Sequence, residues 1–296
     1  MCIGVWTLVH PDYALILCTN RDEFLQRPTQ NAHFHCFGED LHGHKADILS
    51  GLDERAGGTW LGLNRAGRVA LLTNITEPPT TFGTSRGSLV SSFLLSDSSH
   101  PLQDELGKIV PRDAKYSGFN LMLFAPVVNP DSTLSYESIF VTNHGGGGIL
   151  TSRPLSVGER RCGGVSNGID GAGSADWPKV RRATHDFDVA LQILVPGASE
   201  SDLVDRLMEV LTWQCPEPVT QRSELCNTVH VVPVPIKLAN EPGALYGTRL
   251  STVLLIRRDG QVRFVERDIW QLVDGKIARA SPSSERTYQF NLGIQS

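Results

Sequence analysis

The chain has 296 residues, of which 40% are hydrophobic and 20% charged, values that exclude a disordered or fibrous protein. A net charge of −5 without a long basic run argues against binding to nucleic acid or to an anionic membrane surface. No stretch reaches the roughly 18–20 apolar residues that span a bilayer, and we expect no targeting segment at the amino terminus. The six cysteines form no CxxC pair, so we expect free thiols in a reducing cytoplasm.

The predicted elements begin with two hairpins. Residues 3–9 and 13–19 are β-rich runs separated by His10-Pro11-Asp12, and residues 59–63 and 68–73 flank a polar turn that ends in glycine. Further strands are predicted at residues 120–125, 136–142, 229–232, 252–257 and 261–266, and helices at residues 88–95, 102–110, 179–194 and 201–212.

Hairpins dominate this pattern, and the helices fall between groups of strands instead of alternating with single strands. Such an order favours antiparallel sheets covered by helices, an α+β sandwich, over a doubly wound parallel sheet. No low-complexity linker divides the chain, so the sequence predicts a single domain over residues 1–296.

The second residue is a cysteine. Methionine aminopeptidase removes Met1 when residue 2 is small, which makes Cys2 a candidate mature amino terminus. A terminal cysteine carries a nucleophile and a base together, because an α-amino group titrates near about 7.7–8.0 and can take the thiol proton. The alternative for Cys2 is a small, partly buried residue at the start of a strand.

A polar cluster, Asn20-Arg21-Asp22-Glu23, follows the second predicted strand. Antiparallel pairing across the turn at 10–12 places residues 19–22 beside Cys2. Arg21 would then lower the pKa of the thiol, and Asp22 would orient or bind the amino group. The alternative is a polar strand end with ion pairs on the surface.

Three further polar residues lie at strand ends or beside glycines. Asn74 and Asn167 carry amides that suit an oxyanion hole, although Asn is also common in turns. Arg249 precedes an apolar strand and is suited to holding a carboxylate or a phosphate.

A group of histidines raises the question of a metal. Two H-x-H pairs, His33 with His35 and His42 with His44, lie near Cys36 and would place imidazoles on one face of a strand, as zinc or haem requires. Neither a CxxCH haem attachment nor the spacing of a closed zinc site accompanies them. We therefore predict no metal site and interpret this segment as an exposed polar loop, and the alternative is a zinc or haem site.

Several short motifs occur in order along the chain. Taken together, they resemble the transport and Golgi organisation 2 family, also called the NRDE family, from residue 2 to about residue 267. The motifs are Cys2, residues 20–23, Arg27-Pro28, residues 56–62, Leu72-Thr73-Asn74, Ser85-Arg86-Gly87, Trp177-Pro178-Lys179-Val180 and Tyr246-Gly247-Thr248-Arg249.

The resemblance implies a fold, a four-layer αββα sandwich of the amino-terminal nucleophile hydrolase type with mainly antiparallel sheets. Within that group the sequence is most similar to cysteine-dependent conjugated bile-acid and penicillin V acylases. In those enzymes an arginine stands three residues before the aspartate, where this chain has Thr19. Carried over by position, the resemblance implies Cys2 as nucleophile, Asp22 as the group that orients its amine, Asn74 and Asn167 as the oxyanion and amine-orienting amides, and Arg249 as a late arginine.

Two functional hypotheses follow from the resemblance. The first is a factor that binds and traffics a small apolar anion, haem or acyl-CoA, and acts in Golgi and secretory-pathway organisation, with haem as a transported ligand and not a fixed cofactor. The alternative is a cysteine amidohydrolase or thioesterase that cleaves C–N or thioester bonds through Cys2. A third hypothesis is a purely structural or protein-interaction role. The residues predicted to bind the ligand are Asn20, Arg21, Asp22, Glu23, Trp60 and Arg249.

The predicted location is the cytoplasm. The resemblance also allows Golgi or mitochondrial association and a role in lipid homeostasis.

Overall fold

The computed structural model describes residues 1–37, 46–78, 82–98, 100–111, 114–193, 199–236 and 244–293. The chain divides into two compact units. Unit 1 comprises Met1–Arg27, Val157–Ile256 and Val262–Gln289, and unit 2 comprises Pro28–Ser156, Arg257–Gln261 and Phe290–Ser296.

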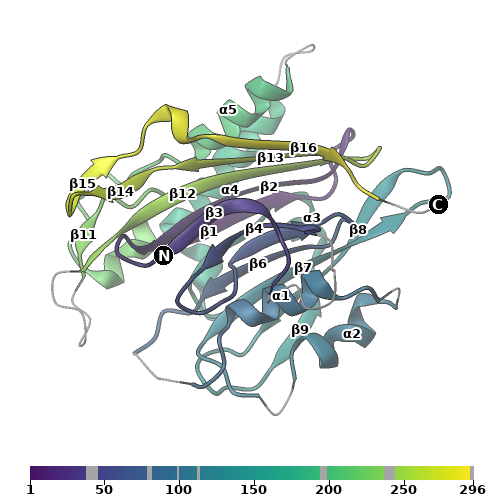
Figure 1. Ribbon diagram of the computed structural model, residues 1–296, viewed down its shortest axis with the longest axis horizontal. Coiled ribbons are helices and arrows are strands. Elements are labelled where there is room, and N and C mark those ends of the chain that lie inside the picture. Colours follow the sequence, from purple (N-terminus) through teal and green to yellow (C-terminus); the bar gives the residue numbers. More distant parts are fainter. Residues whose placement is uncertain are drawn as a thin grey trace. The chain divides into compact units, whose positions relative to one another are not determined.

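The main sheet of unit 1 has seven strands in the order β10-β1-β2-β12-β13-β16, and β11 pairs with β12 (Figure 1). A separate two-stranded sheet joins β14 to β15. The bounds are β1 Ile3–Thr7, β2 Tyr13–Phe24, β10 Gly163–Val165, β11 Val234–Pro235, β12 Leu245–Arg257, β13 Gln261–Asp268, β14 Trp270–Val273, β15 Lys276–Arg279 and β16 Arg286–Asn291.

Strand β1 is the element that positions the amino terminus. It pairs antiparallel with β2, with Ile3 opposite Asn20, and with β10, with Gly4 opposite Val165. The close approach of β10 depends on glycine, because a Cβ on Gly163 would lie 2.3 Å from the Trp6 ring. The first residues of the chain are therefore held between two neighbouring strands.

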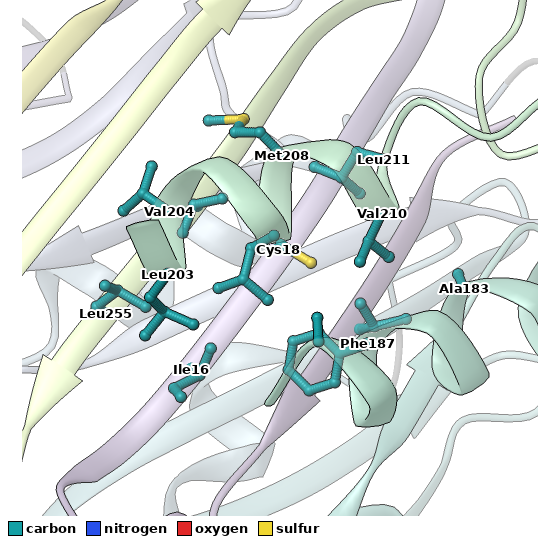
Figure 2. Packing of buried hydrophobic residues seen from close by; sticks show 14 of the residues in the cluster. Ile16, Cys18, Ala183, Phe187, Leu203, Val204, Met208, Val210, Leu211 and Leu255 are labelled. Carbon is teal, nitrogen blue, oxygen red and sulfur yellow. The ribbon is translucent and has the colours of Figure 1, made fainter. Parts of the chain in front are cut away.

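The core of unit 1 lies between its main sheet and two helices, α4 (Pro178–Gln192) and α5 (Glu200–Val210). Figure 2 shows Phe187 of α4 and Leu203 of α5 packed with Ile16 and Cys18 of β2. Pro178 is the first residue of α4, one residue before the predicted start, and a proline at that position loses no helical hydrogen bond.

Helix α5 begins with a capping box. The Ser199 side chain accepts from the backbone N–H of Asp202, and the Asp202 carboxylate accepts from the backbone N–H of Ser199. Unit 1 also contains α3 (Val157–Arg161) and the 3₁₀ turns Ser174–Asp176, Arg222–Asn227 and Pro282–Ser284.

Unit 2 holds the second seven-stranded sheet, in which strands β3 to β9 follow one another in chain order and every neighbouring pair is antiparallel. Helices α1 and α2 contribute to its apolar core, around Phe93 and Leu102. The bounds are β3 Thr29–His35, β4 Ile48–Asp53, β5 Leu61–Asn64, β6 Val69–Asn74, α1 Gly87–Leu95, α2 Leu102–Ile109, β7 Phe119–Val128, β8 Leu134–Thr142 and β9 Thr151–Pro154.

The α+β class with mainly antiparallel sheets is confirmed. The predicted hairpins and all four predicted helices are present, although β2 extends through the polar cluster to Phe24. The single domain and the stacking of the sheets into four layers stay predictions. Within the described residues, no helix has both the length and the apolar character needed to cross a bilayer.

The strand predicted at residues 229–232 is wrong. Val231 makes its backbone contacts with one residue, donating to the Thr248 hydroxyl and accepting from the Thr248 N–H. The backbone N–H of Val231 thus donates to a side chain and not to a neighbouring strand, and β propensity does not reveal such a partner.

Replacing Phe187 by Ala tests the core of unit 1. Phe187 is fully buried, so the cavity should lower the free energy of unfolding by about 3–5 kcal/mol. Urea denaturation followed by circular dichroism measures this change. The control is Val157→Ala, whose side chain is 87% exposed and should change stability by no more than about 0.5 kcal/mol. Equal effects of the two substitutions would contradict the assignment of Phe187 to the core.

Candidate active site at the amino terminus

The buried carboxylate of Asp22 is the centre of a cluster of charged and polar groups. Asp22 lies near the end of β2 and is 3% exposed. Its Oδ1 accepts a 2.6 Å hydrogen bond from the Thr248 hydroxyl. Its Oδ2 lies 3.1 Å from the Met1 ammonium and 3.7 Å from Nζ of Lys179. One carboxylate therefore faces two buried cations.

Met1 is held at three points. Its ammonium, besides facing Asp22, donates to the Tyr246 hydroxyl at 2.6 Å, and its carbonyl accepts a hydrogen bond from Lys179 Nζ. The residue is 4% exposed, and its side chain packs with Leu225 and Ile236. The first residue of the chain is thus enclosed by protein.

Cys2 lies between two strands, next to the Asp22 cluster. Its thiol donates to the Asp22 carbonyl at 3.7 Å, and its own carbonyl accepts from the Ser166 hydroxyl at 2.7 Å. Continuing the antiparallel register by one residue on the β2 side places Cys2 opposite Arg21, and continuing it by two residues on the β10 side places Cys2 opposite Asn167. Directly opposed residues share a face of the sheet, so Arg21 and Asn167 lie on the same face as Cys2.

Asn167 has an unusual environment. The residue is 5% exposed, and its Oδ1 has no hydrogen-bond partner among the described residues. A buried acceptor without a partner costs free energy, so such atoms tend to mark functional sites. The position opposite Cys2 makes this oxygen a suitable acceptor for an amine on that residue.

Burial dominates the electrostatics of the cluster. It raises the pKa of the Cys2 thiol, and the Asp22 charge raises it further. Burial also lowers the pKa of Lys179 and of the Met1 ammonium, while Asp22 opposes that shift in both. With Met1 in place, the thiol is therefore held in its protonated, weakly nucleophilic form.

The other predicted site residues of unit 1 make contacts with protein groups. Asn20 donates to the carbonyls of Leu211 and Val229 and accepts from Ser251, so its amide ties β2 to its surroundings. Glu23 accepts from the Phe24 N–H. Arg249 donates to the carbonyls of Phe24 and Arg27, at the turn after β2.

Two predicted site residues belong to unit 2. Asn74 is the last residue of β6 and pairs with Phe119, and Trp60 is 8% exposed with its ring beside Gly51. Their roles in a site stay predictions.

The histidine cluster is only partly described. His33 and His35 lie on β3 with their rings stacked 4.6 Å apart, and Nε2 of His35 contacts the Ser50 hydroxyl at 2.8 Å. His42 and His44 lie outside the described residues. Among the described residues, no group of three or more His, Cys, Asp or Glu side chains has the arrangement of a metal site. The six cysteines are free thiols.

Sequence reasoning missed three residues of the cluster. Lys179, Tyr246 and Thr248 lie far from Asp22 along the chain, yet each contacts Asp22 or Met1. A signal was present, because all three fall within the motifs at 177–180 and 246–249 that carry the family resemblance.

Comparison with known proteins agrees with this resemblance. Residues 1–271 match the family described as Transport and Golgi organisation 2. The chain belongs to this family. The mouse "Transport and Golgi organization 2 homolog" is 32% identical over 95% of this chain and 93% of its own length. The human "Transport and Golgi organization protein 2 homolog" is 31% identical with the same coverage, 95% and 93%.

Two solved structures are also similar to this family member. One is the Caenorhabditis elegans ortholog of N-acylethanolamine-hydrolyzing acid amidase, with 9% identity, a TM-score of 0.47 and coverage of 86% of this chain and 92% of its own. The other is a mutant of conjugated bile acid hydrolase from Clostridium perfringens, with 10% identity, a TM-score of 0.46 and coverage of 100% and 99%.

Replacing Asp22 by Asn tests the central carboxylate. The change leaves the Met1 and Lys179 cations buried without an anion, so the free energy of unfolding should fall by about 3–5 kcal/mol. The control is Asp176→Asn, which breaks an ion pair with Arg181 in which both side chains are 69% exposed. This substitution should lower the free energy of unfolding by no more than about 1 kcal/mol. Adding Lys179→Met to Asp22→Asn should recover part of the loss. Equal stability of Asp22→Asn and wild type would contradict the central role of this carboxylate.

The pH dependence of thiol alkylation tests the environment of Cys2. In protein that retains Met1, the raised pKa means that the rate of Cys2 alkylation by iodoacetamide should still be rising above pH 9, beyond the usual thiol value of about 8.5. The Asp22→Asn substitution removes a negative charge and should move the profile to lower pH. Peptide mass spectrometry follows Cys2 separately from the other cysteines, and a plateau below pH 8 would contradict the assignment.

Proposed function

We propose that this family member is a cysteine amidohydrolase or thioesterase of the amino-terminal nucleophile type, active once Met1 is removed. The observation that carries the proposal is the Asp22 carboxylate, which holds the amino terminus of the chain at 3.1 Å beside a cysteine. An acid that binds an α-amine next to a thiol is the arrangement that this chemistry requires.

The chemistry follows from the positions of these groups. Removal of Met1 turns the backbone nitrogen of Cys2 into a free α-amine, whose neutral form takes the thiol proton. The thiolate then attacks the carbonyl carbon of an amide or thioester, the leaving amine or thiol departs with a proton, and water hydrolyses the acyl-thioester that remains.

Three neighbours support this reaction. Asp22 and the unpartnered Oδ1 of Asn167 would hold the α-amine in place. Arg21 is 4% exposed and lies opposite Cys2 in the extended register, and in this proposal its role would be to stabilise the thiolate and the negative charge that develops on the substrate oxygen.

A second candidate function applies to chains that keep Met1. In that form Cys2 has no α-amine and burial raises the pKa of its thiol, so the fold would bind and not cleave. The ligand would be haem or a long-chain acyl-CoA, and its carboxylates or phosphates would be held by the cations Arg21 and Arg249. The protein would then bind and traffic such ligands, with a role in Golgi organisation, lipid homeostasis and, through haem, at the mitochondrion.

Two forms of the protein, released from an amino-terminal fusion partner to begin at Met1 or at Cys2, separate these functions. The form that begins at Cys2 should turn over members of a panel of acyl amides and acyl thioesters, and the form that begins at Met1 should not. Cys2→Ser and Asn167→Ala should each lower kcat/KM at least about 100-fold, whereas the control Cys215→Ser should not.

The same experiment can also refute the hydrolase. Equal rates for wild type and Cys2→Ser would refute the hydrolase, and stoichiometric binding of haemin or palmitoyl-CoA by the inactive protein, lost on Arg21→Ala, would favour the second candidate. An intact mass of the protein from its native host shows which form the cell makes.

A further inference from the structure

Met1 occupies its place in unit 1 as a bound ligand would. Its ammonium faces Asp22 at 3.1 Å and Tyr246 at 2.6 Å, its carbonyl accepts from Lys179, and its side chain lies in an apolar cluster. Each of the three parts of an α-amino acid thus meets a group of matching chemistry.

The groups that hold Met1 are deeply buried. Asp22 is 3% exposed and Lys179 is 0% exposed, and the side chain packs with Leu225, Val231 and Ile236, which are 1%, 1% and 6% exposed. Charged groups are rarely buried to this extent without a partner or a ligand. The surroundings therefore form a built site and not a surface depression.

Removal of Met1 cuts one peptide bond and leaves this site on the protein. Asp22, Tyr246 and Lys179 then lose the ammonium and the carbonyl that they contact. The nitrogen of Cys2 remains beside the place of the Met1 carbonyl and, in its protonated form, is a second cation next to Lys179. The emptied site keeps an anion for an ammonium and offers two cations to a carboxylate.

We propose that, in the chain that begins at Cys2, this site binds a free L-α-amino acid with an unbranched apolar side chain, such as methionine. Asp22 and Tyr246 bind its ammonium, Lys179 and the new α-amine of Cys2 bind its carboxylate, and the apolar cluster binds its side chain. The proposal shares with the proposed function the removal of Met1, Asp22 and the α-amine of Cys2, but binding of an amino acid does not require turnover of an acyl substrate.

A free amino acid fits better than the first residue of a peptide. In the structure the atom that follows the Met1 carbonyl is the nitrogen of Cys2 itself, so a peptide would have to place its second residue where the protein chain already runs. The carboxylate of a free amino acid has no second residue to place. It needs only to lie about 2.7–2.9 Å from the nitrogen of Cys2, the distance of a charge-assisted hydrogen bond, in place of the covalent bond that Met1 makes to that nitrogen.

Binding at this site has a consequence for catalysis. The ammonium of the amino acid takes the Asp22 oxygen that would otherwise orient the α-amine of Cys2. A bound amino acid should therefore inhibit the hydrolase, as a competitor for Asp22.

Calorimetric titration of the two forms tests the site. The form that begins at Cys2 should bind L-methionine and L-norleucine with one site per chain. D-methionine, N-acetyl-L-methionine, L-glutamate and the dipeptide Met-Ala should bind at least about tenfold more weakly, because each loses one of the three contacts or lacks room. The form that begins at Met1 should bind none of them.

Two Tyr→Phe variants, one in the site and one outside it, provide a test variant and its matched control. Tyr246→Phe removes one acceptor of the ammonium and should weaken binding of L-methionine about tenfold. Tyr13→Phe makes the same change at a hydroxyl that contacts Glu200 and should leave binding unchanged. Absence of binding by the Cys2 form, equal binding of N-acetyl-L-methionine, or equal binding by the Met1 form would each overturn the proposal.

The titration is repeated with the Cys2→Ser substitution, in which no turnover occurs. Amino-acid binding that persists there without any acyl-substrate turnover by wild type would support the site and refute the hydrolase. Turnover by wild type without amino-acid binding would support the hydrolase and refute the site.

Discussion

The structure of unit 1 depends on one buried carboxylate that must have cations beside it. Asp22 contacts Thr248 from β12, Lys179 from α4 and the ammonium of Met1. Burying these charges is costly unless each faces an opposite charge or a hydrogen-bond partner, so the three segments must assemble together. The amino terminus is thereby a structural component, and its position follows from the same balance of charges that sets the chemistry of Cys2.

The sheet and the helices meet this constraint in different ways. The hairpin of β1 and β2 brings Asp22 beside the first residues through backbone pairing alone. Helix α4 brings Lys179 only because Phe187 and Val180 pack onto the sheet and fix the position of its first turn. Apolar packing of α4 thus places the Lys179 charge beside Asp22, which pairing between strands alone does not do.

The difference between local strand pairing and packing of distant segments also decides how much could be predicted from the sequence. The nearness of Cys2 to Asp22 could be predicted, because a short turn and alternating apolar residues specify the hairpin. Lys179, Tyr246 and Thr248 lie in the motifs of the family, but their contacts with Asp22 and Met1 could not be predicted, since these contacts depend on tertiary packing between segments distant in the chain. The strand predicted at 229–232 failed because Val231 pairs with the Thr248 hydroxyl, and propensity carries no information about such a partner. The α+β class was predictable because hairpins are local.

The enclosure of Met1 limits what the cell can do to this terminus. Acetylation of the α-amine removes its charge and adds an acetyl group at an atom that already lies 2.6 Å from the Tyr246 oxygen and 3.1 Å from a carboxylate. The folded unit 1 has neither the space nor the electrostatic balance for that group. Acetylation at Met1 would therefore oppose the folding of unit 1, because Asp22 would lose one of the two cations that it faces.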